Sequence, residues 1–531
     1  PHKPGCKNGN FNLISIFLLH RFRNQQVQHT SPSICVVFHT NTRVSYPLQP
    51  ELCLIFFNYL HQRNRIRGNW NKMATNMLML LVATLITTCQ GYSQPNIIFF
   101  LADDIGWSDF GYMGYDLVDG TPTIDTLASE GVKLYAVYGG TSCSPGRASF
   151  LSGRYPIRFG MQNSAINTAQ RKGIFLNESL ISNEMQAAGY QTLAVGKWHV
   201  GHAAWAQTPT FRGFDYYYGF MCNGQMDPLT KMNDNYYDLY HDGERETDET
   251  ALSEDTRSSW LYEAKAEDFI ANNRANNPDD PFFIYYALQD PHTPLSSPEY
   301  FLESEPCADM SDSSRKTYCG MIRSIDASVE GIMAALSSYG YYANTLVFFS
   351  GDNGGAPKNG GYNWPLRGSK GSLFEGGIRQ ASWVWGAMLS DNVRGTIYDG
   401  AIHLCDMLPT LMGLATGGHW VPPENKLLDG MDVWSAIATG STSPRNVTLL
   451  NCVDSAGGLR MGDWALLVNQ KDDGWYNPME SSATSVGYHA APDAELKKMS
   501  AATSGDDYYW LYDVNVDPMQ YTDLADDYPE V

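Results

Sequence analysis

Four stretches of the chain begin as continuous apolar runs and then break into polar residues. They are PNIIFFLADD (residues 95–104), YQTLAVGKWHVGH (190–202), PFFIYYALQDPHTP (281–294) and NTLVFFSGDNGG (344–355). A continuous apolar run bounded by polar residues is typical of a strand in a parallel sheet, where both faces are covered. The pattern therefore predicts four buried strands, each with polar side chains at its carboxyl end.

Helical periodicity separates these strands. Apolar residues recur at helical spacing in ESLISNEMQAAG (178–189) and in IRSIDASVEGIMAALSSYG (322–340), and a glycine ends each segment. Strands that alternate with helices predict an α/β fold with a largely parallel sheet flanked by helices. Ligands of such sheets bind beyond the carboxyl ends of the strands, so we expect ADD, GKWH, QDPH and GDNGG to share one rim.

The pattern changes after about Thr416. Gly, Pro and Asn become frequent, and short strand-like runs follow at NVTLLNCV (446–453), DWALLVNQ (463–470) and YYWLYDV (508–514). We therefore expect a larger domain over residues 92–415, which carries the polar strand ends and with them any catalytic groups, and a smaller C-terminal α+β domain over residues 416–531. The chain ends at DLADDYPEV without a helix stop, which is consistent with truncation inside a final helix.

The amino-terminal part differs from the rest in charge. Residues 1–72 carry nine Lys or Arg and one acid, whereas the whole chain has a formal charge of −21. We expect them to be read-through of untranslated sequence, with translation starting at Met73; a genuine basic extension or an internal signal-anchor is the alternative. Residues 73–91 hold an apolar run too short to span a bilayer, followed by small residues, which predicts a signal peptide. The protein would then be lysosomal or extracellular, without a stable membrane span.

Cysteine usage and charge narrow the class of protein. Of ten cysteines, Cys307 and Cys319 flank the short polar segment CADMSDSSRKTYC, which makes them the expected disulfide pair. Asn177 and Asn446 are glycosylation acceptors in a secreted chain. The acidic balance argues against nucleic acid as a partner, because its recognition needs a basic surface. It leaves an anionic substrate open, since one pocket can be positive on an acidic protein.

Two polar pairs close apolar strands and offer hard oxygen ligands. Asp103 and Asp104 follow the first strand, and Asp352 and Asn353 follow the fourth. Hard divalent cations take their ligands from such clusters, and no Cys/His spacing indicates zinc. One Asp doublet is usually a capping or turn pair, but two pairs on one rim favour a Ca²⁺ or Mg²⁺ site.

Cationic side chains are expected on the same rim. They are Lys197 and His199 after the second strand, His292 after the third, Lys370 in the Gly-rich segment RGSKGS, and Arg147 in CSPGR. Each alone is most simply a solvated or satisfied side chain. Together with a metal they suit a tetrahedral oxyanion, because they supply neutralising charge and proton donors for a leaving oxygen.

Cys143 opens the segment CSPGRASFLSGRY (143–155). Pro145 suits the first turn of a helix, because its missing N–H would be unpaired there in any case. Cys143 would then lie at a helix N-terminus, where anions bind. From these residues alone, a thiolate nucleophile and a buried structural cysteine both stay open.

Taken together, these segments resemble the formylglycine-dependent sulfatase family. CSPGR fits the C-x-P-x-R core of that family and ASFLSGRY its extension, while PNIIFFLADDIGWSDFGYMG is similar to its opening strand. The later blocks GKWHVGH, QDPHTP, GDNGG, NWPLRGSKGSLFEGGIR and YDVNVDPMQYTDLA follow in the same order. The resemblance runs from about Gln94 to the end and is greatest to the arylsulfatase B-like branch (N-acetylgalactosamine-4-sulfatase and relatives). It implies an alkaline-phosphatase-like α/β fold and hydrolysis of sulfate esters.

The resemblance also implies a modified residue and a metal. The formylglycine-generating enzyme would oxidise Cys143 to formylglycine in the endoplasmic reticulum, and the aldehyde would hydrate to a gem-diol. One hydroxyl would attack sulfur, the alcohol would leave, and a covalent sulfate hemiacetal would remain; the second hydroxyl would then expel sulfate and restore the aldehyde. One Ca²⁺ would be bound by Asp103, Asp104, Asp352 and Asn353, with the modified Cys143 next to it.

The same resemblance implies a role for each cation. Arg147 would steady the diol, and His199 would be the base for elimination of sulfate. Lys197, His292 and Lys370 would hold the sulfate group, with either His292 or Lys370 protonating the leaving oxygen.

Two positions depart from the family pattern. Gly146 stands where Ser, Thr or Ala is usual, and Ser152 stands where Thr is common, which puts the efficiency of the modification in question. Two other functions stay open: hydrolysis of phosphate or phosphonate esters on the same fold, and a non-catalytic sulfatase-like glycoprotein. The natural ester is open among glycosaminoglycans, other sulfated polysaccharides, steroid sulfates and aryl sulfates, and so is the oligomeric state.

Overall fold

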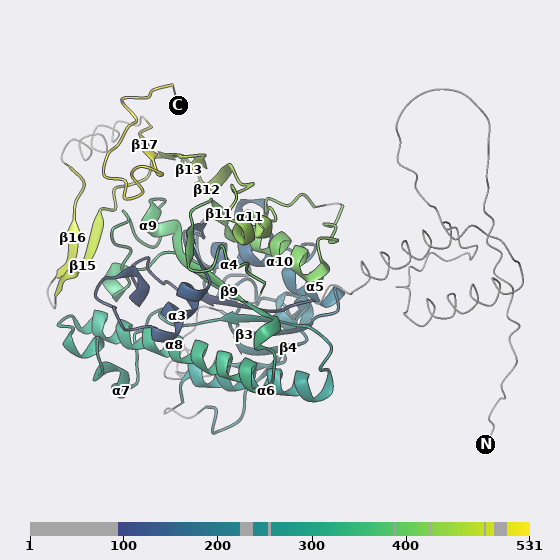
Figure 1. Ribbon diagram of the computed structural model, residues 1–531. Coiled ribbons are helices and arrows are strands. Elements are labelled where there is room, and N and C mark those ends of the chain that lie inside the picture. Colours follow the sequence, from purple (N-terminus) through teal and green to yellow (C-terminus); the bar gives the residue numbers. More distant parts are fainter. Residues whose placement is uncertain are drawn as a thin grey trace, which may run out of the picture. The chain divides into compact units, whose positions relative to one another are not determined.

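The four predicted strands lie side by side in one sheet (Figure 1). The computed structural model describes residues 94–222, 237–252, 256–386, 388–424, 426–482, 485–492 and 507–530. The strands are β1 (Asn96–Ala102), β3 (Gln191–Lys197), β7 (Phe282–Ala287) and β8 (Thr345–Gly351), and all their residues but Gln191 are buried. Their order β8–β1–β7–β3 is parallel throughout, with Ile98 of β1 opposite both Ile284 and Val347. The prediction of buried parallel strands is confirmed.

The rest of this sheet is mixed. Within the described ranges it has eleven strands, in the order β10–β2–β9–β8–β1–β7–β3–β4–β5–β6, with β11 paired to β2. The outer strands are β2 (Val132–Tyr138), β4 (Tyr216–Phe220), β5 (Tyr240–His241), β6 (Glu244–Arg245), β9 (Arg379–Gly386), β10 (Thr396–Tyr398) and β11 (Ile402–His403). Strand β9 runs antiparallel to both β8 and β2, so the sheet is largely but not wholly parallel.

Helices cover both faces of the sheet. Successive residues of β1 point to opposite faces, and those on each face pack against a different set of helices. Ile98 and Phe100 belong to the same buried cluster as residues of α3 (Pro122–Glu130), α6 (Ser258–Asn276) and α8 (Ser313–Ser338). Ile97 and Phe99 share the other cluster with residues of α4 (Cys143–Ser152), α5 (Ile181–Ala187), α10 (Met407–Thr416) and α11 (Trp434–Thr439). Figure 1 shows α6 and α8 together on one side of the sheet. The predicted α/β architecture is thus present.

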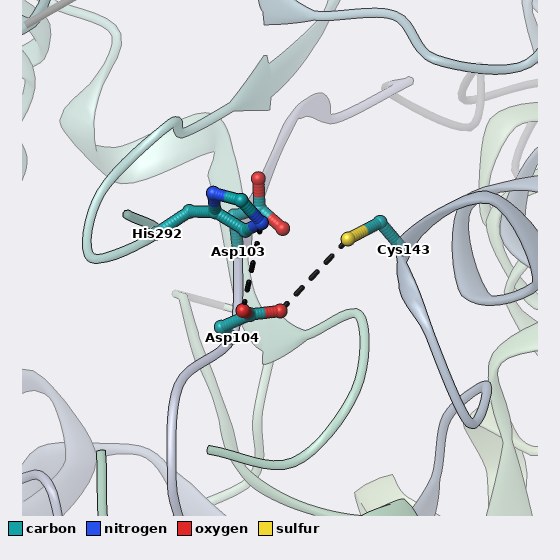
Figure 2. Close-up of side chains that lie close together, drawn as sticks. All are labelled: Asp103, Asp104, Cys143 and His292. Atoms are coloured by element: carbon teal, nitrogen blue, oxygen red, sulfur yellow. Dashed lines mark hydrogen bonds and ion pairs between the residues drawn. The ribbon is translucent and has the colours of Figure 1, made fainter. Parts of the chain in front are cut away.

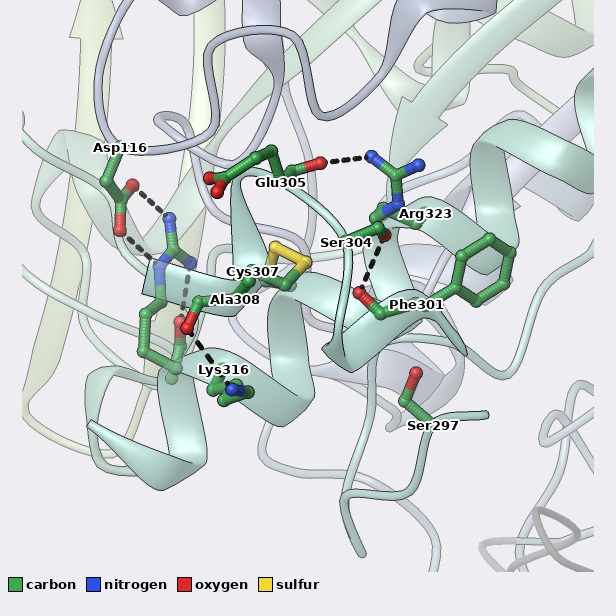
Figure 3. The surroundings of a disulfide bond; sticks show 12 residues. Asp116, Ser297, Phe301, Ser304, Glu305, Cys307, Ala308, Lys316 and Arg323 are labelled. Atoms are coloured by element: carbon green, nitrogen blue, oxygen red, sulfur yellow. Dashed lines mark hydrogen bonds and ion pairs between the residues drawn. A yellow bond between two sulfur atoms is a disulfide. The ribbon is translucent and has the colours of Figure 1, made fainter. Parts of the chain in front are cut away.

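Helix α8 begins at Ser313, well before the predicted start at residue 322. The side chain of Asp312 accepts a hydrogen bond from the Arg315 backbone N–H and caps the helix. Cys319 therefore lies inside the helix, and its disulfide to Cys307 is present, with the Cα atoms 5.6 Å apart (Figure 3). The predicted pair is confirmed, although much of the segment between the cysteines is helix rather than loop.

The C-terminal part forms a second, antiparallel sheet. Its order is β12 (Val447–Val453), β13 (Ala456–Met461), β14 (Trp464–Val468) and β17 (Tyr509–Asp513), and β15 (Trp475–Ser482) pairs separately with β16 (Ser485–His489). Trp510 and Tyr512 of β17 share a buried cluster with Tyr138 and with Phe374, which precedes α9 (Glu375–Ile378). The small sheet therefore packs against the segment that carries Lys370.

Two predictions about the organisation of the chain are not tested by these elements. Residues 1–93, which include the predicted leader and signal peptide, lie outside the described residues. The domain boundary at residue 415 stays a prediction, and Leu414 and Val433 on its two sides belong to one buried cluster. Among the described residues, no helix is both long and apolar enough to cross a bilayer.

The disulfide is expected to contribute measurably to stability. Replacing Cys307 and Cys319 by Ser removes a link between residues 12 positions apart, which corresponds to about 3 kcal/mol of unfolding free energy in the chain-entropy description. We expect a lower Tm for C307S/C319S in thermal unfolding followed by circular dichroism. C452S is the control, because Cys452 is exposed and free. An unchanged Tm for the double variant would contradict this role.

Candidate active site

The carboxyl ends of β1 and β8 bring the two acidic pairs together. Asp103 and Asp104 follow β1, Asp352 and Asn353 follow the neighbouring β8, and each is at most 4% exposed. The Asn353 side-chain amide donates to Asp104 Oδ1 at 2.8 Å, and the Asp104 backbone N–H donates to Asp352 Oδ1 at 3.3 Å. The four predicted metal ligands therefore lie in one buried cluster.

Asp104 adopts a left-handed backbone conformation, with φ of 66°. A residue other than glycine adopts it only when its surroundings hold it there. The Tyr318 hydroxyl of α8 lies 3.0 Å from the Asp104 carbonyl oxygen and 2.6 Å from Asp109 Oδ2. Arg315, also on α8, donates to Asp109 Oδ1 at 2.7 Å. Helix α8 thus fixes the backbone of Asp104 through a buried network.

Two buried cations pair with the acids. Lys197, at the end of β3, forms an ion pair with Asp103. Arg147 of α4 lies 2.9 Å from Asp352 Oδ2 and 3.7 Å from Asp103 Oδ1. Burial alone would raise the pKa of Asp103, but Lys197 and the neighbouring cations hold it well below its usual value. Burial raises the pKa of Asp352 to about 7, even though Arg147 opposes the shift.

The thiol of Cys143 faces this cluster (Figure 2). Its Sγ lies 3.8 Å from Asp104 Oδ1 and 3.4 Å from Lys370 Nζ. Lys370 Nζ is also 2.7 Å from Asp104 Oδ2, and His292 Nε2 is 3.6 Å from the same oxygen. Ligand atoms of Asp103, Asp104, Cys143 and His292 all lie within 4.8 Å of one another. The structure therefore brings residue 143 next to both predicted metal ligands and predicted sulfate ligands.

The unmodified Cys143 is a poor nucleophile in this position. Burial raises the pKa of its thiol, and the charge of Asp103 raises it further. The thiol therefore stays protonated at neutral pH, whereas the thiolate is the reactive form. Cys143 is the first residue of α4 and has cations around it. This position favours binding of an anionic ligand, and does not favour attack by a Cys143 thiolate.

His199, which follows β3, is set up to accept a proton. Its Nε2 lies 2.7 Å from the Ile166 carbonyl oxygen, which can only accept, so Nε2 carries the hydrogen. Burial, with the charge of Lys197 nearby, lowers the pKa of His199 well below its usual value and keeps the ring neutral. Nδ1 is buried and has no hydrogen-bond partner among the described residues. The free lone pair is therefore on Nδ1.

The acidic pairs fit a hard cation. Asp103 Oδ1 and Asn353 Oδ1 are buried and accept no hydrogen bond within the described part of the chain. A buried oxygen without a donor costs free energy, and a divalent cation would satisfy both. Carboxylate and amide oxygens are the ligands that Ca²⁺ prefers.

Gly146 lies against the backbone of Asp352. A Cβ atom at position 146 would be 2.2 Å from the Asp352 carbonyl oxygen. That oxygen also accepts a hydrogen bond from the Gly140 N–H at 2.9 Å. Helix α4 thus packs on the end of β8 without room for a side chain, which gives the departure from the family pattern a physical reason.

Several residues that hold the site are not evident from the sequence. Ser144 Oγ donates to the His199 carbonyl oxygen at 2.8 Å and accepts the Ile166 N–H at 2.9 Å. Arg147 donates to the Tyr285 hydroxyl at 3.4 Å. These residues, like Tyr318, lie in segments whose spacing is that of ordinary strands, helices and loops. Two of the supporting residues, Asp109 and Ser144, do lie inside the sulfatase-like blocks. For these two, the order of the blocks is the only signal in the sequence.

Comparison with known proteins decides the family. The model of the sulfatase family matches residues 95–418 of this chain. This chain belongs to the sulfatase family. Mouse arylsulfatase J is 34% identical to this sulfatase over 470 residues, covering 83% of this chain and 74% of the relative. Human arylsulfatase A is 32% identical over 390 residues, covering 70% and 73%.

Solved structures agree with the family. The structure of Ps i-CgsB in complex with k-i-k-neocarrahexaose matches this sulfatase with a TM-score of 0.67 and 27% identity, over 82% of this chain and 90% of that one. A phosphonate monoester hydrolase of Agrobacterium radiobacter shares the fold, with a TM-score of 0.52 and 16% identity over 82% and 92% of the two chains. The predicted family and fold class are confirmed, and the chain is a sulfuric ester hydrolase. The arylsulfatase B-like branch stays a prediction.

Gly146 gives a test of the close approach between α4 and β8. The resemblance alone would make G146S harmless, because Ser is usual at this position in the family. The 2.2 Å contact instead predicts that a Cβ displaces Asp352 and costs about 1–3 kcal/mol of stability. We expect G146S to lower the Tm and, if Ca²⁺ binds at the acidic pairs, to give a smaller rise in Tm on adding Ca²⁺ than the wild type gives. Mass spectrometry of residue 143 separates this effect from a change in modification; a wild-type Tm and Ca²⁺ response would overturn the interpretation.

Proposed function

We propose that this sulfatase hydrolyses sulfate esters of a sulfated glycan, with formylglycine at position 143 and one Ca²⁺ per chain. The observation that carries the proposal is the buried cluster in which Cys143 faces both the acidic pairs and the cations. The names of similar proteins support the substrate class: Ps i-CgsB was solved with a neocarrahexaose, and a mouse N-acetylgalactosamine-6-sulfatase is 32% identical over 403 residues.

Two groups beyond the standard side chains would take part. Formylglycine would supply a hydrated aldehyde at a position where the unmodified thiol stays protonated. Asp103, Asp104, Asp352 and Asn353 would hold Ca²⁺, which would supply positive charge beside the sulfate group. The orphaned oxygens of Asp103 and Asn353 support this ligand set.

The cations bind and orient the anion. Arg147 lies one helical turn after Cys143, so the two share a face of α4, and its guanidinium is fully buried. It is therefore placed to hold the modified side chain in one orientation. Lys197, whose charge is balanced by Asp103, adds a second fixed positive charge to the site. Fixed charges in a buried site stabilise developing negative charge without reorganising.

Lys370 is the better placed donor for the leaving oxygen. Burial alone would lower the pKa of Lys370, but the charges of Asp104 and Asp103 oppose this, so the ammonium group keeps its proton. Its Nζ lies 3.4 Å from the Sγ of residue 143. His292 Nδ1 lies 2.6 Å from the Thr293 carbonyl oxygen and carries the hydrogen of the neutral ring. His292 Nε2 then carries a hydrogen only in the protonated ring, which is also the form that can bind a sulfate oxygen, whereas the Lys370 ammonium always has a hydrogen to give; we therefore assign the leaving oxygen to Lys370 and contact with the sulfate group to protonated His292.

His199 provides the base for release of sulfate. Its ring is neutral, its Nε2 hydrogen is held by the Ile166 carbonyl oxygen, and the Nδ1 lone pair is free. Ser144, the residue after Cys143, holds the backbone of His199 by a hydrogen bond. The base and the modified residue are therefore fixed to each other through α4.

Maturation in the secretory pathway follows from this chemistry. The formylglycine-generating enzyme would act on the CSPGR segment, and the mature sulfatase would be lysosomal or extracellular. Asn177 and Asn446, the two glycosylation acceptors, are both exposed. Exposure is a requirement for their modification and supports this location.

The function is tested on protein made in eukaryotic secretory cells. We expect mass spectrometry to show formylglycine at position 143, and C143A to reduce aryl sulfate turnover by about 10³-fold or more. Aryl phosphate is the matched control substrate. It tests the alternative that this chain hydrolyses phosphate or phosphonate esters, the reaction class for which a hydrolase of the same fold is named. Unmodified Cys143 in an active enzyme, or faster turnover of aryl phosphate than of aryl sulfate, would refute the proposal.

Calcium binding is expected to depend on pH through Asp352. Its pKa of about 7 in the metal-free protein lies above the unfolded value, so its neutral form stabilises the fold at low pH and this contribution is lost as the pH rises through 7. Ca²⁺ needs the charged form, so its affinity should fall by about tenfold per pH unit below 7. The rise in Tm on adding Ca²⁺ should be larger at pH 8 than at pH 5.5.

The isosteric variant D352N is the control for this linkage. It mimics the neutral acid, so its Tm without metal should no longer fall between pH 5.5 and 8, and its response to Ca²⁺ should shrink at both values. An equal Ca²⁺ response of the wild type at both pH values would contradict the assignment of Asp352.

A further inference from the structure

A hollow of about 400 Å³ lies on the surface, and the chemistry above does not use it. Its lining includes Phe159, Met161, Arg171, Lys172, Phe175 and Gln207. These residues come from the segment that follows α4 and from the turn Trp205–Gln207 that follows β3. Both segments start at residues of the candidate active site.

The loop that carries the two cations is anchored to the active site at both ends. At one end, Ile166 bonds to His199 Nε2 through its carbonyl oxygen and to Ser144 through its N–H. At the other end, Gly173 pairs with Gly201 in an antiparallel bridge, and the Ile174 N–H donates to the Val200 carbonyl oxygen at 2.9 Å. Residues 167–172 therefore form a held loop that leads directly from the base to the hollow.

This part of the surface is positive in an acidic protein. Arg171 and Lys172 are both exposed, and no carboxylate of the described residues forms an ion pair with either. Neither residues 153–177 nor residues 197–214 contain an Asp or Glu, although the chain has 57 acidic residues and a formal charge of −21. Such a local excess of cations attracts an anion that the rest of the surface repels.

The hollow also exposes apolar surface. Phe175 is 52% exposed and Leu176 is 58% exposed, and Trp205, in the turn that contributes Gln207, is 58% exposed. Exposed apolar groups that gather around a concavity mark a binding surface. A sulfated sugar matches all of these groups, because its C–H face packs on aromatic rings, its hydroxyls pair with amides, and its sulfates pair with Arg and Lys.

We propose that this hollow binds a sulfated sugar unit of the same polysaccharide whose ester lies at residue 143. Arg171 and Lys172 contact the sulfate of that unit, Phe175 contacts its ring, and Gln207 contacts a hydroxyl. The enzyme then acts within or near the end of a polyanionic chain rather than on an isolated monosaccharide. This inference rests on the proposed function for the position of the ester, but the binding itself is independent of turnover.

The test measures binding without catalysis. C143A is titrated with three sulfated polysaccharides, carrageenan, chondroitin sulfate and dextran sulfate, at several salt concentrations. We expect at least one to bind, and R171A/K172A in the same background to weaken that binding by about tenfold and to reduce its dependence on salt, because fewer counterions are released. R274A is the control, since Arg274 is an exposed cation near the C-terminal end of α6 (Ser258–Asn276), away from the carboxyl ends of the strands. Failure of all three polymers to bind, or equal binding by the double variant, would overturn the proposal.

Two further measurements separate the possible failures. In the active enzyme, kcat/KM for the bound polysaccharide should fall about tenfold relative to that for an aryl sulfate when Arg171 and Lys172 are replaced. If the wild type does not turn over aryl sulfate, the proposed function is wrong. The binding measurement with C143A then still decides whether the hollow binds a sulfated sugar. Asn177 lies two residues from Phe175, so N177Q is compared as well. If only the N177Q variant binds a polysaccharide and the protein with Asn177 does not, the protein's own glycan covers the hollow. This result would also overturn the inference.

Discussion

Three carboxylates buried at the ends of two adjacent strands are the constraint on which the rest of this structure depends. Asp103, Asp104 and Asp352 are each at most 4% exposed. Removing even one such charge from water costs several kcal/mol unless it is paired. Arg147 from α4, Lys197 from β3 and Lys370 from a distant loop supply the pairing. The fold therefore has to deliver cations from several elements to one point, and those same cations suit an anionic substrate.

The C-terminal sheet and α8 are supports for this charge balance. Ser369, next to Lys370, donates both its backbone N–H and its hydroxyl to Asp473, at 2.8 and 2.6 Å. The Gly368 N–H donates to the Gly474 carbonyl oxygen at 2.8 Å. The C-terminal segment thus fixes the loop that carries Lys370, while Tyr318 of α8 fixes the strained backbone of Asp104. Elements that hold no catalytic group still determine where the charges lie.

The sequence predicted the parts of the fold that local patterns encode. Strands β1, β3, β7 and β8 have continuous apolar runs, and their carboxyl ends identified the acidic pairs and most cations. The first turns of α8 were missed, because Ser313–Thr317 is polar and reads as loop. Strand β9 was missed, since polar residues interrupt RQASWVWG, although every residue in it is buried. The role of Tyr318 could not be predicted, because its contacts join residues more than 200 positions apart.

At Gly146 the family pattern and the structure of this chain point to different roles for the residue. The pattern marks the residue as a departure that concerns recognition by the modifying enzyme. The structure shows that the same position sets how closely α4 approaches Asp352. Both requirements concern one short segment. Under the proposed function CSPGR has to be recognised by the modifying enzyme, and in the folded chain it packs without a side chain at position 146, so that Asp352 keeps its place beside Arg147. The chemistry is thus fixed at the strand ends by buried charge, whereas the anchored loop at residues 167–172 can vary in sequence without disturbing it, because its two ends are held by backbone groups of Ile166 and Gly173. Under the two proposals, reaction and substrate selection depend on different parts of the chain.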